Sequence, residues 1–398
     1  MKQVLIWIGA LVVGTILGLL QIGAVDATAN VVATVYVRLF QLLSVPTIVL
    51  AVTTTLATLG RSDGAGRIFR HTITYTLLTT FAAAAVGLLL YVSINPNVNV
   101  NENYSLTSHP SPITSENISF ADHLVNVIPN NIIHPLLEGN VLSLLLLAAA
   151  VGIALSRMPE NDRKEVLLKG LFGLQDLLFT LIRALIWTLP VGIVAFAAQL
   201  SAQLGTGIAA DSLGRYVSVV LGGNLLQFFV VLPLFLLLRG LNPVRVLGRM
   251  MPAVLMALFT KSSAATLPVT MESAEKQLGV QPKVARFVLP ICTTINMNGC
   301  AAFILVTSLF VMQQGGVELT FSTMLLWLLI SVVSAIGNAG VPMGCYFLTF
   351  SLMTGVGAPV EVLGLILPIY TIIDMVETAV NVWSDSCVCA MTDKDLSA

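Results

Sequence analysis

The sequence predicts an all-α polytopic membrane protein, and three observations carry this prediction. The chain is 56% hydrophobic and only 10% charged, whereas soluble domains carry about 25% charged residues. Apolar runs long enough to cross a bilayer recur from one end of the chain to the other. Two further apolar segments, 247–275 and 321–356, are interrupted at their centres by small and polar residues, as in helical hairpins that enter and leave a membrane on one side.

The uninterrupted apolar runs predict eight transmembrane helices. The first begins after Lys2, is too long for the core of a signal peptide and lacks a clear cleavage site. We therefore expect it to remain as a span. The expected spans, with boundaries good to a few residues, are 4–22, 31–58, 69–94, 141–156, 170–200, 213–239, 284–312 and 359–391.

Basic residues predict the orientation, because they concentrate in cytoplasmic loops. Lys2 places the N-terminus in the cytoplasm, and basic clusters at 61–70, 157–169 and 239–249 mark further cytoplasmic segments. The polar segment 96–140 contains no lysine or arginine, so it is predicted to be an extracytoplasmic loop. Both termini are expected in the cytoplasm.

The segment 247–275 has basic clusters on both sides. A full crossing would move one cluster outside, whereas a re-entrant hairpin keeps both inside. Its centre reads TKSSAATLP, and Lys261, Ser262 and Ser263 suit a loop tip buried within protein. An ordinary kinked helix is the alternative, and the charge distribution argues against it.

The segment 321–356 reads SAIGNAGVPMGC at its centre, where Gly337, Gly340 and Pro342 interrupt the helix. No basic residue flanks it, so an ordinary kinked helix stays open on the residues alone. Two broken segments in corresponding places predict inverted repeats around a binding site at the membrane midplane.

The final span carries a polar face. Asp374, Glu377, Asn381 and Asp385 are separated by three, four and four residues, so they share one side of a helix, with Thr378 beside them. Snorkelling to the interface is open to Asp385 near the inner end, but the other two acids lie too far in. Such acids are expensive in a membrane and point to function.

The stretch 287–393 carries no lysine or arginine, so a ligand is expected to neutralise these carboxylates. Sodium prefers oxygen ligands, which Asn381 and Asp385 offer. An ammonium group would suit Asp374.

A second polar cluster, TTINMNGCAAF, lies inside the seventh span at 293–303. Asn296 and Asn298 beside Gly299 suggest a locally unwound, ion-coordinating segment, although asparagines also hydrogen-bond neighbouring helices. The threonines of YTLLTT at 75–80 bond their own helix by default.

The five cysteines all lie in predicted membrane segments, and none lies in the 96–140 loop, where an external disulfide would be expected. All four histidines lie within the first 134 residues of the chain, so metal binding by the cysteines is not expected. We interpret the cysteines as small packing residues. They are Cys292, Cys300, Cys345, Cys387 and Cys389.

Four motifs together resemble the dicarboxylate/amino acid:cation symporter family, the glutamate-transporter-like fold. TKSSAATLP resembles the serine-rich tip of its first hairpin, TTINMNGC its NMDGT motif, GNAGVP its second hairpin tip, and DMVETAVNVWSD its final-span motif. The motifs follow the family's order and spacing, and the resemblance covers essentially the whole chain. It implies eight transmembrane helices, two re-entrant hairpins, a homotrimer, sodium coupling and an elevator movement.

The resemblance also implies two functional parts. The first, second, fourth and fifth spans would form mainly the scaffold and trimer contacts, within 1–70 and 130–245. The third and the sixth to eighth spans, with both hairpins, would form mainly the transport unit, within 71–95 and 213–398.

Site residues follow from the resemblance, residue by residue. Asp374 would receive the substrate's ammonium, and Asn381 its carboxylate, together with the backbone of the first hairpin tip. The substrate-binding residues implied are Ser262, Ser263, Cys300, Gly340, Val341, Asp374, Glu377, Thr378 and Asn381.

Three sodium sites are implied in the same way. One uses Asp385, Asn381, Asn296 and the carbonyl of Cys292; a second uses the carbonyls of Thr294, Ala335, Ile336 and Asn338; a third uses Thr79, Thr80, Asn296 and Asn298. The family's motif has Asp where this chain has Asn298, which predicts a weaker third site or fewer coupled ions, because affinity for hard cations falls with ligand charge.

Two departures bear on the substrate. Members that carry acidic substrates have Arg where this chain has Glu377, and Thr where it has Cys300. A glutamate would repel a distal carboxylate. The bacterial serine/threonine branch has ETALN where this chain has ETAVN.

We therefore expect a sodium-coupled symporter of small neutral, serine- or threonine-like amino acids. It would lie in a bacterial inner membrane, with sodium as co-transported ion rather than cofactor. Sodium- or proton-coupled symport of glutamate, aspartate, C4-dicarboxylates or cationic amino acids is the alternative. The net charge of −1 gives no electrostatic case for nucleic acid.

Two other classes were weighed. An intramembrane hydrolase would need a Ser/His pair, but the histidines lie far from the serines of TKSSAATLP. Asp374 and Asp385 are about 16 Å apart along one helix, too far for a carboxylate dyad. The chain is not expected to be an enzyme. A passive channel is distinguished from a carrier by uptake that saturates and depends on a sodium gradient.

Overall fold

Helices make up all regular structure in the residues that the computed structural model describes, which are 2–59, 66–96, 128–133, 135–136, 141–204, 208–336, 338 and 343–397. The elements are α1 Lys2–Leu19, α2 Gly23–Leu59, α3 Gly66–Ile94, α6 Val141–Arg157, α7 Asp162–Leu204, α8 Ile208–Leu226, η1 Gln227–Val231, α9 Leu232–Leu238, α10 Pro243–Thr260, α11 Ser263–Glu272, η2 Ser273–Leu278, α12 Pro282–Ile295, α13 Asn298–Gln314, α14 Phe321–Ile336, α15 Gly344–Gly355 and α16 Glu361–Ser397.

The predicted all-α polytopic class is confirmed. By length and composition, four described helical segments are apolar enough to cross a membrane, and the bent helices α7 and α16 raise this to six. The count of eight spans stays a prediction. Most of the 96–140 loop lies outside the described residues.

The first hairpin turns where the sequence predicts. Lys261 ends α10 in the left-handed conformation, with φ of 55°, and Ser262 follows in an extended conformation. The Ser262 hydroxyl accepts a hydrogen bond from the backbone N–H of Ala265 at 3.2 Å, which caps α11. The chain therefore reverses inside an apolar segment, and α10 packs against α11.

The second hairpin consists of α14 and α15, both in contact with α13. Met343 precedes α15 with φ of 61°. A side chain at Gly344 would overlap the Asn338 amide, so only glycine fits there. The predicted breaks at Gly337, Gly340 and Pro342 lie outside the described residues.

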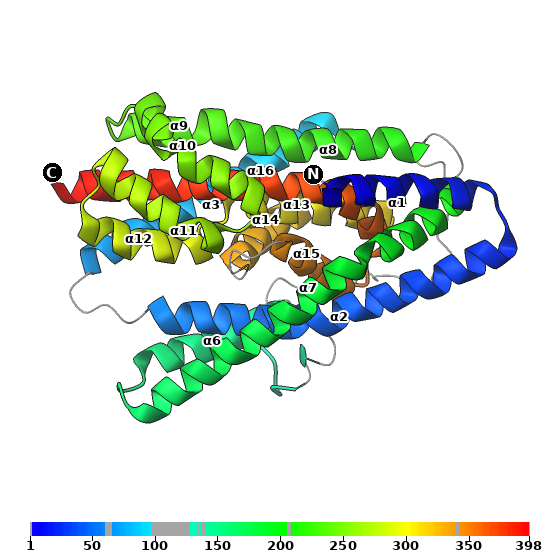
Figure 1. Ribbon diagram of the computed structural model, residues 1–398, viewed down its shortest axis with the longest axis horizontal. Coiled ribbons are helices and arrows are strands. Elements are labelled where there is room, and N and C mark those ends of the chain that lie inside the picture. Colours follow the sequence, from blue (N-terminus) through cyan, green and yellow to red (C-terminus); the bar gives the residue numbers. More distant parts are fainter. Residues whose placement is uncertain are drawn as a thin grey trace.

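The helices form two groups by contact (Figure 1). α2 packs against α6 and α7, and α1 packs against α7. α16 is surrounded by α3, α8, α10, α11, α12 and α13, and it also touches α1 and α7. α16 is therefore the element on which most of the second group converges.

Charged residues tie together one end of this second group. Asp395, near the end of α16, accepts a hydrogen bond from Tyr75 and lies 3.7 Å from Arg239. Arg286 forms two hydrogen bonds to Glu275, at 2.8 and 3.0 Å. Asp395 therefore joins α16 to α3 and to the end of α9, and the paired hydrogen bonds of Arg286 join α12 to η2.

The α1–α7 contact depends on small residues four positions apart, as in close helix pairs within membranes. A Cβ at Gly18 would overlap the Ala198 carbonyl of α7, whereas a Cβ at Gly9, on the same helix, meets nothing within 4 Å. We expect Gly18→Val to cost about 1–3 kcal/mol through overpacking and to lower the unfolding midpoint in detergent by more than about 3 °C.

Gly9→Val is the matched control, since it makes the same change of helix propensity in open space. Equal midpoints for the two variants would contradict this packing.

Candidate functional site

The seventh apolar segment is broken inside the membrane, between α12 and α13. Asn296 and Met297 leave helical geometry, with ψ of 65° and 67°. The N–H of Asn296 still bonds the Cys292 carbonyl, at 2.8 Å. A break of this kind frees backbone carbonyls for a ligand.

Asn296 links the break to the final helix. Its side-chain amide donates to Asp385 Oδ1 and to the hydroxyl of Ser384, both at 2.9 Å. Its carbonyl oxygen accepts hydrogen bonds from Asn298 at 2.9 Å and from Thr79 at 3.2 Å. One asparagine therefore connects α3, the break and α16.

Asn298 lies at the centre of a second set of contacts. Its amide group lies 3.4 Å from each of the hydroxyls of Thr79 and Thr80. Its carbonyl oxygen accepts a hydrogen bond of 2.7 Å from Gln227. The structure thus brings together all four residues predicted for the third ion site. The hydroxyls of Thr79 and Thr80 therefore contact asparagine side chains of another segment of the chain, and not only their own helix as expected by default.

The polar face of α16 is closed to solvent. Asp374, Glu377, Thr378, Asn381 and Asp385 have exposed fractions between 1% and 5%. None of the three carboxylates has a basic group within 4 Å among the described residues. The ion pairs found among the described residues all involve other acidic side chains.

Asn381 and Glu377 lie against the start of α13. The backbone N–H of Gly299 donates to Asn381 Oδ1 at 2.8 Å. A Cβ at Gly299 would lie 2.8 Å from the Glu377 Cα, so glycine permits this approach of α13 to α16. The Asn381 amide nitrogen lies 3.5 Å from Cys300 Sγ.

Glu377 is incompletely partnered. Tyr370 donates to its Oε2 at 3.2 Å, while Oε1 is buried without a hydrogen-bond partner. A buried carboxylate oxygen without a partner costs free energy. It therefore marks a place where a ligand group fits.

Asp374 lies against the second hairpin, and the charge at the tip of the first hairpin acts on it at longer range. The N–H of Met343, at the second hairpin, donates to Asp374 Oδ2 at 3.3 Å. Lys261, at the tip of the first hairpin, interacts electrostatically with Asp374. Ser262 and Ser263, the next two residues of the chain, are buried. A basic group thus approaches the acids from a distant part of the chain, which the base-free stretch 287–393 does not reveal.

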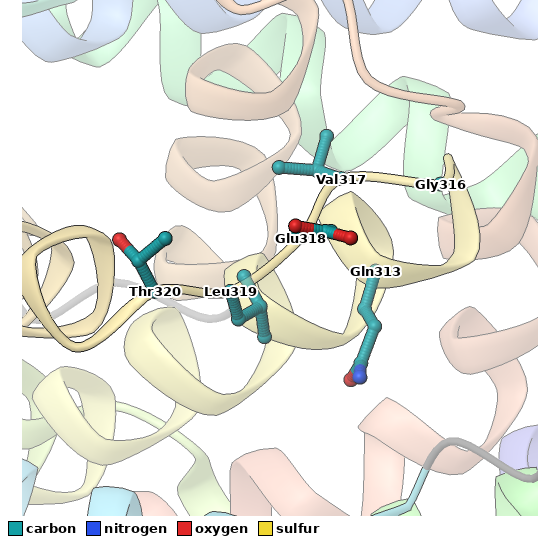
Figure 2. A pocket seen from close by; sticks show the side chains of 6 residues that line it. All are labelled: Gln313, Gly316, Val317, Glu318, Leu319 and Thr320. Atoms are coloured by element: carbon teal, nitrogen blue, oxygen red, sulfur yellow. The ribbon is translucent and has the colours of Figure 1, made fainter. Parts of the chain in front are cut away.

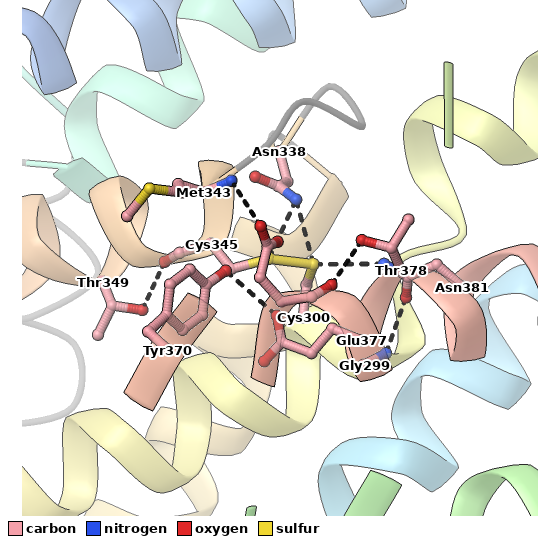
Figure 3. The surroundings of a disulfide bond; sticks show 11 residues. Gly299, Cys300, Asn338, Met343, Cys345, Thr349, Tyr370, Glu377, Thr378 and Asn381 are labelled. Atoms are coloured by element: carbon pink, nitrogen blue, oxygen red, sulfur yellow. Dashed lines mark hydrogen bonds between the residues drawn. A yellow bond between two sulfur atoms is a disulfide. The ribbon is translucent and has the colours of Figure 1, made fainter. Parts of the chain in front are cut away.

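A disulfide joins Cys300 of α13 to Cys345 of α15, with Cα atoms 5.6 Å apart (Figure 3). The prediction that all five cysteines are packing residues is wrong for these two. The second hairpin brings α15 onto the start of α13, and residues 45 apart in sequence become neighbours. Cys292, Cys387 and Cys389 are free and buried.

The carbonyls predicted for the second ion site are only partly placed. α12, which carries Thr294, contacts α14, whose last residues are Ala335 and Ile336. The Ala335 carbonyl accepts the N–H of Asn338 at 3.2 Å. Gly340 and Val341, predicted to bind substrate, lie outside the described residues.

Three further side chains contribute that the motifs do not single out. Gln227 opens the π-helix η1 and contacts Asn298, Ser384 contacts Asn296, and Tyr370 contacts Glu377. The sequence signal for Gln227 is an uncharged polar residue inside an apolar span. The structure adds that this residue opens a π-helix, a feature often found at functional sites.

A pocket of about 450 Å³ lies elsewhere, at the turn between α13 and α14 (Figure 2). It is formed by Gln313 and residues 316–320, at the opposite end of α13 from Gly299. Glu318 is its one charged lining residue. We assign the site to the buried polar face of α16 instead, because that is where the unpaired groups converge.

Known proteins resemble the chain over nearly its whole length. The sodium:dicarboxylate symporter family matches residues 3–395. The neutral amino acid transporter B(0) of Oryctolagus cuniculus is 30% identical, over 96% of this chain and 78% of that protein. The neutral amino acid transporter A of Homo sapiens is 29% identical, over 88% and 73%. Excitatory amino acid transporter 1 of Ambystoma tigrinum is 25% identical, over 88% and 74%.

The geometry predicts that Asp385→Asn weakens cation binding. The substitution keeps the size of the side chain but removes a buried charge beside Asn296, and hard-cation affinity falls with ligand charge. The sodium concentration that gives half-maximal thermal stabilisation should rise by about tenfold or more.

Asp393→Asn is the matched control on the same helix. Asp393 lies near the C-terminal end of α16, where it accepts a hydrogen bond from the backbone N–H of Gln281. Sodium dependence that is unchanged in Asp385→Asn would remove Asp385 from the ion site.

Proposed function

Because the chain belongs to the sodium:dicarboxylate symporter family, we propose that it carries a small neutral amino acid, serine- or threonine-like, into the cell together with sodium. Membership makes the protein an integral membrane transporter and not an enzyme, and it makes Na⁺ its co-transported ion. The hydrolase alternative falls with this. The substrate is the part that we propose.

Glu377 is the observation that carries the proposal. Its carboxylate is buried on the same face as Asp374 and Asn381, with one oxygen unpaired. A substrate with a second carboxylate would bring like charges together without water, which costs several kcal/mol. A short side chain with a hydroxyl group instead offers a hydrogen-bond donor to Oε1.

Cys300 supports the same substrate class. It lies beside Asn381 and is tied to Cys345, so it offers no hydroxyl donor for a distal carboxylate. Two groups that would favour an acidic side chain are thus absent from one part of the site. The substrate's ammonium would meet Asp374, and its carboxylate would meet Asn381 and the N-terminal backbone of α11.

A cationic amino acid is the second candidate. The unpaired oxygen of Glu377 would also accept a hydrogen bond from an ammonium or guanidinium group, at favourable charge. The two candidates share the argument against acidic substrates and differ only in side-chain length and charge.

The asparagine and threonine contacts support two of the proposed sodium sites. Asp385 supplies the charged oxygen of one, next to Asn296. The other has only neutral oxygens from Thr79, Thr80, Asn296 and Asn298, so we propose that it binds sodium weakly. The carbonyls of Thr294, Ala335, Ile336 and Asn338 would form the remaining one, the second ion site of the family pattern.

We further propose the division of labour that the family implies. α1, α2, α6 and α7 would hold a homotrimer in the membrane, and the helices around α16 would move as the transport unit. Arg239 lies with Asp395 and Tyr75 at the end where α16 finishes, and Arg245 and Arg249 follow it in the sequence. These basic residues support cytoplasmic termini, here in a bacterial inner membrane.

The substrate is tested by competition in liposomes. We expect uptake of radiolabelled serine to require an inward sodium gradient, to saturate, and to be inhibited by excess serine, threonine and alanine. Aspartate should compete at least about tenfold more weakly, as repulsion by Glu377 requires.

Strongest competition by aspartate would contradict the role of Glu377. Strongest competition by arginine or lysine would select the second candidate, and uptake that does not saturate would indicate a channel.

A further inference from the structure

Three groups that could ligate a metal ion, two sulfur atoms and one carboxylate, meet at one point in the site. The Sγ atoms of Cys300 and Cys345 and a carboxylate oxygen of Glu377 all lie within 4.8 Å of one another. They come from α13, α15 and α16, and all three residues are buried. Figure 3 shows these side chains converging from separate helices.

A fourth group faces the same point. The Asn338 amide nitrogen lies 3.1 Å from each of the two sulfur atoms, and its carbonyl oxygen is buried without a partner. Glu377 Oε1 is also unpaired. A half-turn of the Asn338 amide exchanges its nitrogen and oxygen in place. A buried carboxylate oxygen of Glu377 and, after that half-turn, the amide oxygen of Asn338 therefore border the two sulfur atoms.

We propose that, once the Cys300–Cys345 disulfide is reduced, the two thiolates and Glu377 bind one soft divalent metal ion, with the Asn338 carbonyl oxygen as the fourth ligand. Thiolate and carboxylate ligands in a tetrahedral arrangement suit Zn²⁺ or Cd²⁺. The asparagine completes the four ligands that closed sites of these ions use.

The chemistry balances in two steps. A phosphine reductant with water supplies two electrons and two protons, which convert the disulfide to two thiols and the phosphine to its oxide. The metal ion then displaces two protons from the thiols. With metal–sulfur bonds of about 2.3 Å in a tetrahedron, the sulfur atoms separate to about 3.8 Å, within the flexibility of two side chains whose Cα atoms are 5.6 Å apart.

Cys300 and Cys345 can either form the disulfide or bind the metal ion, but not both at once. The oxidised pair has no thiolate to offer, so only the reduced protein binds the ion. A further consequence rests on the proposed function: the bound ion would prevent the amino acid from binding, because Glu377 and Cys300 border the proposed substrate site. It would hold α15 against α13 and α16, as the disulfide does.

Binding is tested on the purified full chain without any transport measurement. The protein is first reduced with a phosphine, and the phosphine is then removed under oxygen-free conditions. CdCl₂ is added in steps, and the ultraviolet absorption of cadmium–thiolate bonds and the heat of binding are recorded. We expect about one Cd²⁺ per chain in the reduced protein and no such absorption in the oxidised protein.

Cys345→Ser should weaken Cd²⁺ binding by at least about a hundredfold, and Glu377→Gln should weaken it by about tenfold or more. Cys387→Ser is the matched control, since Cys387 is equally buried and free, and it should bind as the wild type does. Equal binding in Cys345→Ser, or a loss only in Cys387→Ser, would overturn the proposal. Should Cys345→Ser not fold, the comparison of oxidised with reduced wild type decides, and equal binding in both would overturn it.

Competition separates this inference from the proposed function. Serine should raise the apparent Kd of Cd²⁺ in the reduced protein, and Cd²⁺ should inhibit sodium-driven serine uptake there but not in the oxidised protein. Absence of serine uptake would refute the proposed substrate while the cadmium titration still stands. A titration with no thiolate absorption would refute the metal site while uptake still stands.

Discussion

The structure depends on three carboxylates buried on one face of α16. Asp374, Glu377 and Asp385 are almost entirely removed from solvent, and no described basic group lies within 4 Å of them. Each ionised acid inside a membrane costs about 2.5–3.5 kcal/mol or more. In the proposed function, sodium ions and the ammonium group of the substrate offset this cost when they bind, and their departure restores it.

Broken helices give this charged face its ligands. The interruption at Asn296 and Met297 and the two hairpin tips place backbone groups and amides where a continuous helix would have none free. Neighbouring helices compensate: Gln227 bonds Asn298, and Gly299 bonds Asn381. Buried apolar side chains of α12, α13 and α15 pack around this strip.

Local patterns predicted the helical class, the turn at Lys261 and Ser262, and the polar face of α16, because each depends on residues close in sequence. Contacts between distant segments escaped prediction. The Cys300–Cys345 bridge and the approach of Lys261 to Asp374 arise only once the hairpins fold back. The position of the cysteines in membrane segments and the distance of the histidines predicted packing cysteines and no metal. The Glu377 carboxylate comes near Cys300 and Cys345 from a third helix, which their separation in sequence does not reveal.

We propose that the charge at position 377 selects the substrate, and charge variants at this position provide the test. Sodium-driven uptake of labelled serine and aspartate is compared in the wild type, in Glu377→Gln and in Glu377→Arg. The account predicts that reversing the charge shifts the ratio of aspartate to serine uptake by more than about a hundredfold, with the neutral variant between. A ratio that stays the same in all three proteins would contradict it.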